Sequence, residues 1–446
     1  MVKIYTSYSV KIKHYNHIFK DTIVIYRSIL DFFLSVCLEK WDIISRLNGD
    51  LQKQSYVERI THKTKSRPTP EYDFDKKFYK FPSYLRRAAI SDAIGKISSY
   101  KSNLANWEKL DPLTRGRAPA IPKAGFSFPC LYKDNMYQEL DTYEARIKVY
   151  IHNTWDWITL SLKRFDVDYI NRRCRSRKKC NPTLVKRGKE WFLDFPFEEK
   201  VELSDTDILD QTIIAVDLGI NSAATISVML SDGTILGRHF LKLPREYDSL
   251  QHAINRIKKA QQNRNHKTSR LWAKAKGIND DIAVKTAAFI MEIAAKYNAD
   301  VIVFEHLEVR GKKRGSKKQR LHMWRSQYVQ SMVTDKAHRA GMRVSRICAW
   351  GTSKFAYDGS GTVCRGKKAG FNSYSMCRFK NGKVYNCDLS ASYNIGSRYF
   401  ICEILKSLPE KVRLALEAKV PQAAKRSTCT LSTLINLNAG LMSLAA

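Results

Sequence analysis

The sequence predicts an α/β protein whose first half forms a separate, β-rich lobe. An apolar run from Ile213 to Val216 ends in an acid, Asp217. Two further strand patterns follow at residues 222–230 and 234–243, as in an antiparallel meander. Helical and strand patterns then follow one another, which is typical of a sheet covered by helices. In the first ~200 residues, strand patterns flank one long helical stretch, which indicates a curled sheet or barrel with an inserted helical bundle.

Composition indicates a large and strongly basic protein. At 446 residues, with 44% hydrophobic residues, the chain is long enough for two or three domains with buried cores. Its 77 Lys and Arg against 43 Asp and Glu leave a net charge of +34. That excess indicates a polyanionic partner, with nucleic acid as the first candidate and an anionic membrane surface as the second.

Membrane spans and targeting signals are not expected. The most apolar early stretch, Ile23 to Leu38, is interrupted by Arg27 and Asp31, and the first residues show no signal-peptide pattern. The 10 cysteines are scattered along the chain, as in a protein of a reducing compartment. We therefore expect a cytoplasmic protein.

The N-terminal half is expected to form a β-barrel from residues 1–15 and 112–205, interrupted by a helical lobe over residues 16–111. Apolar residues alternate from Val2 to Ile12, which indicates a half-buried strand. The apolar spacing then changes to three and four, as in amphipathic helices. Strand patterns resume after the helical lobe and include a hairpin that turns at Gly188.

The second half alternates predicted helices with predicted strands. Residues 245–275 are expected to form a basic, polar helix, and Asn279 to cap a second helix with two acids in its first turn. The apolar run from Val301 to Leu307 is a predicted buried strand that carries Glu305. Asp388 opens a later helix, and the last ~40 residues are expected to form a helix and a loose tail.

Three acids, Asp217, Glu305 and Asp388, each punctuate an otherwise apolar element. A strand that carries an acid and leads into an antiparallel meander is how an RNase H-like nuclease begins. Acids on a central strand, on the adjacent strand and at a helix start can converge on one site. Phosphodiester hydrolysis is served by two Mg²⁺ ions about 3.5–4 Å apart, which carboxylate oxygens hold. We therefore predict that the three acids are catalytic residues and ligands of two Mg²⁺ ions.

The segments around these acids resemble those of a known family. The three split RuvC motifs of TnpB nucleases are similar to Val216–Gly219, Ala299–Leu307 and Asp388–Ile395, and two further matches between the last two motifs are Lys336–Val344 and Gly351–Ser353. TnpB proteins are transposon-encoded RNA-guided enzymes, and the compact type V CRISPR effectors are their relatives.

The resemblance implies both a fold and a function. It implies an RNase H-like RuvC nuclease domain over residues 206–350 and 388–446, behind a wedge β-barrel with a helical recognition lobe. It also implies a metal-dependent DNA endonuclease that cuts DNA selected by base pairing to a bound guide RNA. The protein itself would read only a short motif beside the target.

Residues 351–387 are expected to form a degenerate, zinc-knuckle-like insert that binds target nucleic acid. In TnpB proteins, two Cys-x-x-Cys pairs in this segment together hold zinc. Here Ala356 and Gly359 stand in place of the first pair, and Lys380 follows Cys377 where the second pair would end. The irregularly spaced thiols that remain nearby are not a four-ligand site, so we do not expect zinc.

Two basic loops and one basic helix are the candidate phosphate-binding elements. Their contacts with guide RNA or target DNA would be directed at phosphates and sensitive to salt, because a charge excess spread over both halves favours polyanion binding over a merely solvated surface. The candidate residues are Arg172, Arg173, Arg175, Arg177, Lys178, Lys179, Lys258, Lys259, Arg264, Lys312, Lys313 and Arg314.

Other functions remain open at this stage. An unguided RuvC-type nuclease of transposition or recombination would use the same acids, although it would not need so large an N-terminal lobe. An RNA-guided DNA-binding repressor with weak cleavage would use the same partners, although an intact acid triad argues against it. The sequence shows no clear dimer stripe, so the oligomeric state is also open.

Overall fold

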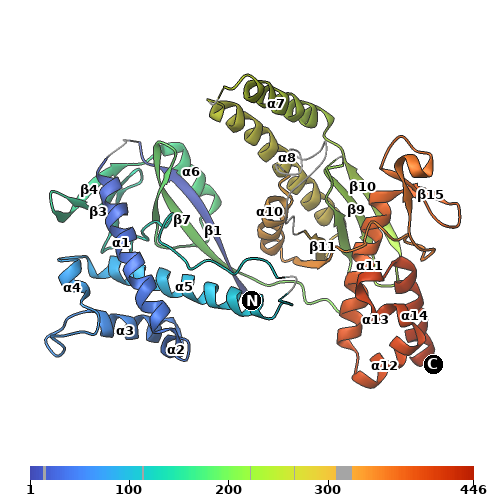
Figure 1. Ribbon diagram of the computed structural model, residues 1–446, viewed down its shortest axis with the longest axis horizontal. Helices are drawn as coiled ribbons and strands as arrows, with labels where there is room; N and C mark the ends of the chain where they lie inside the picture. Colours follow the sequence, from blue (N-terminus) through green and yellow to red (C-terminus); the bar gives the residue numbers. More distant parts are fainter. Residues whose placement is uncertain (14–16, 113–114, 221, 266, 308–323, 446) are drawn as a thin grey trace. The chain divides into compact units, whose positions relative to one another are not determined.

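The computed structural model describes residues 1–13, 17–112, 115–220, 222–265, 267–307 and 324–445. It divides into two compact units, which we name the N-terminal unit (Tyr5–Glu199) and the C-terminal unit (Met1–Ile4 with Lys200–Ala446). Figure 1 labels most of their helices and strands. Among the described residues, no helix is long and apolar enough to cross a membrane.

The strands of the N-terminal unit form two open sheets. One sheet has the order β1-β7-β5, with β6 paired to β7, and the other has the order β2-β3-β4. Isolated bridges join Ile12 to Leu162 and Cys130 to Thr183. The strands are β1 (Val2–Lys11), β2 (Tyr137–Asp141), β3 (Glu144–Ile151), β4 (Thr154–Ser161), β5 (Lys178–Lys179), β6 (Thr183–Arg187) and β7 (Glu190–Val201).

The described strands form no closed barrel, so the wedge β-barrel expected from the sequence is not confirmed. Barrel closure requires a continuous ladder between first and last strands, and the two sheets are joined only by single bridges. The predicted hairpin is confirmed, because β6 and β7 pair in register and Gly188 between them has φ of +61°.

The helices of this unit share one hydrophobic core with both sheets. Phe19, Phe33 and other buried residues of α1 pack with α5 residues such as Ile90, and with Ile147 and Trp191 of the strands. The predicted helical insertion thus has no separate core of its own. The helices are α1 (Ile18–Glu39), α2 (Trp41–Ile44), α3 (Asp50–Thr61), α4 (Phe74–Lys77), α5 (Ser83–Glu108) and α6 (Arg164–Arg173).

The C-terminal unit is built on a five-stranded sheet of order β10-β9-β8-β11-β12. The pairs β10–β9 and β9–β8 are antiparallel, whereas β11 runs parallel to both β8 and β12. The sheet combines the predicted meander with the predicted strand around Glu305. Its strands are β8 (Ile213–Asp217), β9 (Ala224–Met229), β10 (Ile235–Leu241), β11 (Val301–His306) and β12 (Arg343–Cys348).

Helices cover both faces of this sheet. Ile213 and Ala215 of β8 belong to a core with α11, whereas Ile214 and Val216 belong to a core with α8 and α10. The alternation follows from the two-residue period of a strand, and it explains why β8 is apolar on both faces. The helices are α7 (Pro244–Gln262), α8 (Ser269–Lys296), α10 (Ser326–Arg339) and α11 (Cys387–Ser407).

Two details of the C-terminal unit differ from the sequence prediction. Asn279 does not cap a helix; it lies buried inside α8, which begins at Ser269, because Ala275 and Ile282 of α8 pack against α7. The last residues also form no loose tail. Leu434 and Leu437 of α14 are fully buried with α11. The terminal helices are α12 (Glu410–Lys419), α13 (Pro421–Ala424) and α14 (Leu431–Ala445).

A small three-stranded sheet lies between β12 and α11 in the sequence. Its order is β13-β14-β15. Ala356, Cys377, Phe379 and Cys387 form its buried cluster, with Tyr357 and Tyr385 packed against them. Ala356 and Cys377, which stand at two of the family's zinc-ligand positions, thus lie in hydrophobic packing. The strands are β13 (Cys364–Arg365), β14 (Met376–Arg378) and β15 (Val384–Asn386).

The close approach of α11 to the sheet yields a stability prediction. A Cβ at Gly396 would lie against the Sδ of Met229 and 3.1 Å from the Cβ of Ala215, so Gly396→Ala should cost about 1–3 kcal/mol of stability by overpacking. Gly277 lies inside α8 with nothing within 4 Å, so Gly277→Ala should be neutral or stabilise by up to ~1 kcal/mol. Thermal unfolding of the two variants checks this, and equal midpoints would contradict the tight α11–sheet contact.

Candidate active site

The three predicted acids lie on the face of the sheet that α11 covers. Asp217 ends β8 two residues after Ala215, and Glu305 lies on β11 two residues after Val303. Ala215 and Val303 both belong to the core beneath α11, so the strand period directs both acids to that side. Phe304 pairs with Val216 in the parallel ladder, which places the two acids at the same end of neighbouring strands.

Asp388 comes to this place from the N-terminus of α11. The side chain of Asn386 accepts a hydrogen bond from the backbone N–H of Leu389 at 2.9 Å and so caps the helix. Asp388 follows in the first turn, where the helix dipole favours a carboxylate.

Burial acts on all three carboxyl groups, and repulsion from the other two acids adds to it at Asp217. Burial is the main cause that raises the pKa of Asp217 well above its usual value, and the charges of Glu305 and Asp388 raise it further. Burial also raises the pKa of Glu305 and of Asp388. The three acids therefore share one electrostatic environment that disfavours their ionised forms.

Two polar residues hold the Glu305 carboxylate in place. The buried Thr352 hydroxyl donates a hydrogen bond to Glu305 Oε1, and this hydrogen bond opposes the effect of burial on the Glu305 pKa. The side-chain N–H groups of Asn394 on α11 donate at 2.9 Å to the carbonyl of Thr352 and at 2.9 Å to that of Phe355. Thr352 was part of a matched motif, but its role was not apparent from the sequence.

Two arginines supply positive charge near the acids. Arg398, buried on α11, donates to four backbone carbonyls, and its charge opposes the raised pKa of Glu305. Arg365 on β13 opposes the raised pKa of both Asp217 and Asp388. One guanidinium nitrogen of Arg365, Nη2, is buried without a hydrogen-bond partner among the described residues. Arg365 could not be recognised in the sequence, because a two-residue strand has no detectable period.

The chemistry of the acids fits a hard divalent cation, although their side chains are not preassembled as ligands. Among the described residues, no three His, Cys, Asp or Glu side chains lie close enough together to hold a metal ion. Burial nevertheless raises the pKa of all three carboxyl groups, and the charges of Glu305 and Asp388 raise that of Asp217 further. Carboxylate oxygens are the ligands that Mg²⁺ prefers, so the donor set suits that ion.

The basic candidate residues fall into three groups. Arg177 and Lys178 pair with Glu199 and Glu198, and Lys179 pairs with Glu139, whereas Arg172, Arg173 and Arg175 are exposed on or just after α6. Lys258 and Lys259 are exposed on α7, and Arg264 follows that helix. Lys312, Lys313 and Arg314 lie outside the described residues.

The chain is similar to proteins of Aquifex aeolicus (strain VF5). A family model described as the Aq_aa04 family matches residues 6–151. The "TnpB-like protein aq_aa05" is 28% identical over 234 residues, which are 47% of this chain and 74% of that protein. The "Uncharacterized protein aq_aa04" is 28% identical over 127 residues, which are 26% of this chain and 68% of that protein. The resemblance to TnpB predicted from the sequence is confirmed by the relative with that name.

Solved structures of type V CRISPR effectors are also similar. The chain in the Cas12f1–sgRNA–target DNA complex is 12% identical, covers 88% of this chain and 98% of its own length, and has a TM-score of 0.34. The chain in the AacC2c1–sgRNA binary complex is 9% identical, and its TM-score is 0.38. The match covers 85% of this chain and 70% of that one.

The raised pKa of Asp217 predicts a pH-dependent gain in stability when its charge is removed. In the metal-free protein at about pH 7.5, Asp217→Asn should raise the unfolding temperature by a few degrees. A carboxyl group whose pKa is higher in the folded state destabilises the fold once the pH exceeds its unfolded pKa of about 3.9. The gain should therefore vanish by about pH 4, where both states bind the proton.

Thermal unfolding in a chelator at the two pH values measures this difference. The exposed Asp335 on α10 offers the matched control, since Asp335→Asn should leave the unfolding temperature nearly unchanged. A loss of stability in Asp217→Asn at neutral pH would show that Asp217 makes favourable contacts that outweigh its burial.

Proposed function

We propose that this protein is an RNA-guided DNA endonuclease whose RuvC-type site consists of Asp217, Glu305 and Asp388. The observation that carries the proposal is the placement of these three acids, from three distant segments, on the α11 side of one sheet within electrostatic reach of one another. The relative named as TnpB-like supports the same reading.

The strand order supports an RNase H-like assignment for the C-terminal unit. Strands β10 and β9 form an antiparallel meander with the central β8, and β11 and β12 continue the sheet in parallel on its other side. This order brings an acid on the central strand beside an acid on the adjacent strand, and a following helix can add the third. Acids from these positions would serve phosphodiester hydrolysis once metal ions are bound.

The residues around the acids have separate proposed roles. Mg²⁺ ions, when bound, would neutralise negative charge on the attacking and leaving oxygens and activate a water molecule. Asp217, Glu305 and Asp388 would hold these ions, and Thr352 would fix the orientation of the Glu305 carboxylate. Arg365, with an unpartnered nitrogen, would bind the scissile phosphate and hold it toward the acids.

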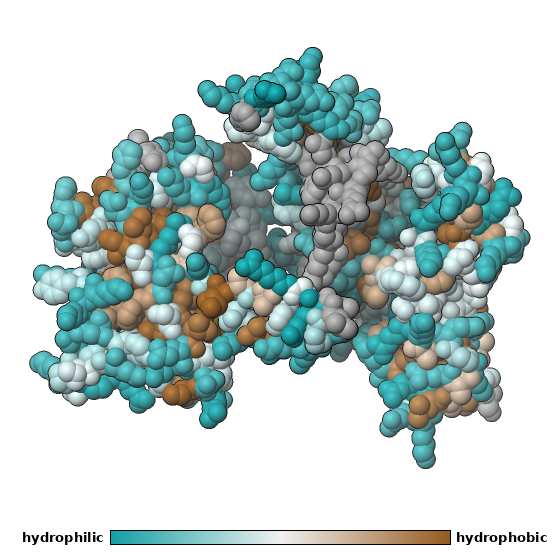
Figure 2. All heavy atoms as spheres, viewed as in Figure 1, coloured by the Kyte–Doolittle hydropathy of each residue, from teal (hydrophilic) through white to brown (hydrophobic). Residues whose placement is uncertain are grey.

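Guide RNA and target DNA are the proposed partners, and the net charge of +34 supports them. An open groove of about 710 Å³ between α7 and α8 is lined by Arg256, Lys259 and Lys274. Figure 2 shows hydrophilic side chains over this helical hairpin. Cations that line one groove suit contacts to phosphates, which would position a nucleic acid without reading its sequence.

Removal of one acid should abolish cleavage. Asp388→Ala is expected to lower the cleavage rate of target DNA by roughly 10³-fold, because metal ions at such a site contribute several kcal/mol of transition-state stabilisation. Binding of RNA and DNA should survive, and a chelator should have the same effect on the wild type. Glu403→Ala, on the same helix but paired with Lys406 at the surface, is the matched control and should cut normally.

The guide for this assay is the nucleic acid that remains bound when the protein is purified in high salt. A discrete RNA with a constant scaffold and a variable end is expected on sequencing. Undiminished cutting by Asp388→Ala would refute the site assignment. Recovery of no RNA, or of random RNA, together with acid-dependent cutting would instead identify an unguided nuclease.

Arg365 should set the acidic limb of the pH–rate profile. Its charge opposes the raised pKa of Asp217 and Asp388, so Arg365→Met should raise both pKa values. Fewer carboxylates are then ionised at a given pH, and the acidic limb of the cleavage profile should move to higher pH. The exposed Lys367 nearby gives the control Lys367→Met, for which the limb should stay in place. A uniform loss of rate without a shifted limb would limit Arg365 to phosphate binding.

A further inference from the structure

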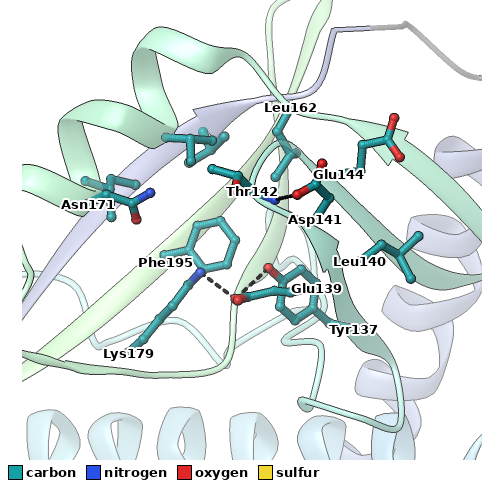
Figure 3. A pocket seen from close by; sticks show the side chains of 13 residues that line it. Tyr137, Glu139, Leu140, Asp141, Thr142, Glu144, Leu162, Asn171, Lys179 and Phe195 are labelled. Carbon is teal, nitrogen blue, oxygen red and sulfur yellow. Dashed lines mark hydrogen bonds and ion pairs between the residues drawn. The ribbon is translucent and has the colours of Figure 1, made fainter.

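The N-terminal unit contains a cavity of about 330 Å³ far in the sequence from the acids (Figure 3). Its inner wall is apolar and buried, and includes Val10, Leu162, Ile170 and Phe195. The ring of Phe195 meets that of Tyr137 edge to face, with centroids 5.6 Å apart. The volume falls at the lower end of the range for small-molecule pockets, roughly 300–1,000 Å³. The Lys179 ammonium lies 4.3 Å from the centroid of the Phe195 ring, so a ligand in the cavity would meet apolar side chains and one cation.

The rim of this cavity is polar and mostly acidic. Figure 3 shows Glu139, Asp141 and Glu144 along one side and Asn171 of α6 opposite them. Lys179 donates a hydrogen bond to Glu139 Oε1 at 2.5 Å, and the Tyr137 hydroxyl donates to the same oxygen at 3.1 Å. The carboxylate is therefore held in one orientation at the mouth of the cavity.

Glu139 remains an acceptor at neutral pH. Burial alone would raise its pKa, but hydrogen bonds and charges, chiefly those of Lys179, lower it overall. Three carboxylates against one ammonium leave the rim negative, which repels a phosphate. A ligand with hydrogen-bond donors and a planar apolar face is therefore favoured inside the cavity.

A basic and aromatic groove adjoins the cavity at Asn171. This open groove of about 740 Å³ is lined by Phe165, Asp168, Asn171, Arg172 and Arg175, and Asn171 also borders the cavity. Phe165 is 67% exposed, which leaves its ring face open for stacking. Arginines next to an exposed aromatic ring are suited to a single strand, with phosphates on the cations and a base on the ring.

We propose that this region binds a single-stranded stretch of RNA, with one everted guanine in the cavity and the flanking phosphates at Arg172 and Arg175. The proposal rests on the proposed function, because it assigns a site to the guide RNA. Guanine presents two adjacent donors, N1–H and the N2 amino group, which a carboxylate accepts together. Its O6 acceptor suits the ammonium of Lys179 or the amide of Asn171.

The other bases fit this rim less well. Adenine and cytosine each offer one amino group beside a ring acceptor, and uracil offers one N–H between two carbonyls. A carboxylate facing these edges meets at least one acceptor and loses the paired hydrogen bond. Bases that are splayed out and read on this edge are common in single-stranded RNA recognition.

The test measures binding of fluorescein-labelled ten-nucleotide RNAs to the full-length protein, freed of bound nucleic acid, by fluorescence anisotropy. Wild-type protein should bind oligouridine with one central guanosine about tenfold tighter than oligouridine alone, because a good bidentate contact discriminates by about 1–3 kcal/mol. A central adenosine or cytidine should give little gain. Glu139→Gln and, as a second variant, Glu144→Gln should reduce the preference for guanosine.

Two further variants separate the cavity from the groove. Arg175→Ala should weaken binding of every RNA alike and reduce the salt dependence by about one charge, with the guanosine preference kept. Glu190→Gln breaks a comparable surface ion pair with Lys11 away from the cavity and should keep both affinity and preference.

The outcomes distinguish this proposal from the proposed function. RNA binding without a guanosine preference, or a preference that both acidic-rim variants retain in full, would overturn the cavity assignment alone. Failure of every RNA to bind at about 0.1 M salt would overturn the guide-RNA part of the proposed function as well. Cleavage assays on Asp388→Ala report on the acids independently of either result.

Discussion

The C-terminal unit depends on the burial of β8 between two helical layers. Ile213 and Ala215 face α11, and Ile214 and Val216 face α8 and α10, so the strand has no polar face to expose. Each residue of this strand is thereby fixed to one side of the sheet. A slip of one residue would turn Asp217 to the opposite face and bury apolar side chains against the wrong helices. The position of the first acid is consequently as well determined as the core itself.

The acids lower the stability of the metal-free fold, and burial of the hydrophobic core offsets this loss. Carboxyl groups whose pKa is raised by burial, and at Asp217 also by the other two acids, destabilise the metal-free fold at neutral pH. The helix dipole at Asp388, the hydroxyl of Thr352 and the charges of Arg365 and Arg398 relieve part of this cost. Destabilisation that remains after these contacts is typical of sites where charge is needed for function. A bound cation or a transition state can offset the remaining electrostatic repulsion.

The sequence predicted those elements correctly in which the hydrophobic pattern is long and regular. The strands that carry Asp217 and Glu305 are apolar on both faces and were recognisable, and the α11 start at Asp388 followed from its apolar side. The prediction that Asn279 caps a helix was wrong. Contacts with α7 extend α8 toward its N-terminus, past the local capping signal at Asn279. Barrel closure is not confirmed, because it depends on pairing between distant strands, which period alone does not determine.

Packing within the segment between β12 and α11 positions two side chains that act on the acids. What the acids receive from this segment is the Thr352 hydroxyl and the Arg365 charge. Arg365 is aligned because β13 pairs with β14, where it lies opposite the fully buried Cys377. Cys377 in turn packs with Ala356 and other members of one hydrophobic cluster, in which rings from Tyr357 and Phe379 meet edge to face. Packing thus positions the Arg365 side chain near the acids.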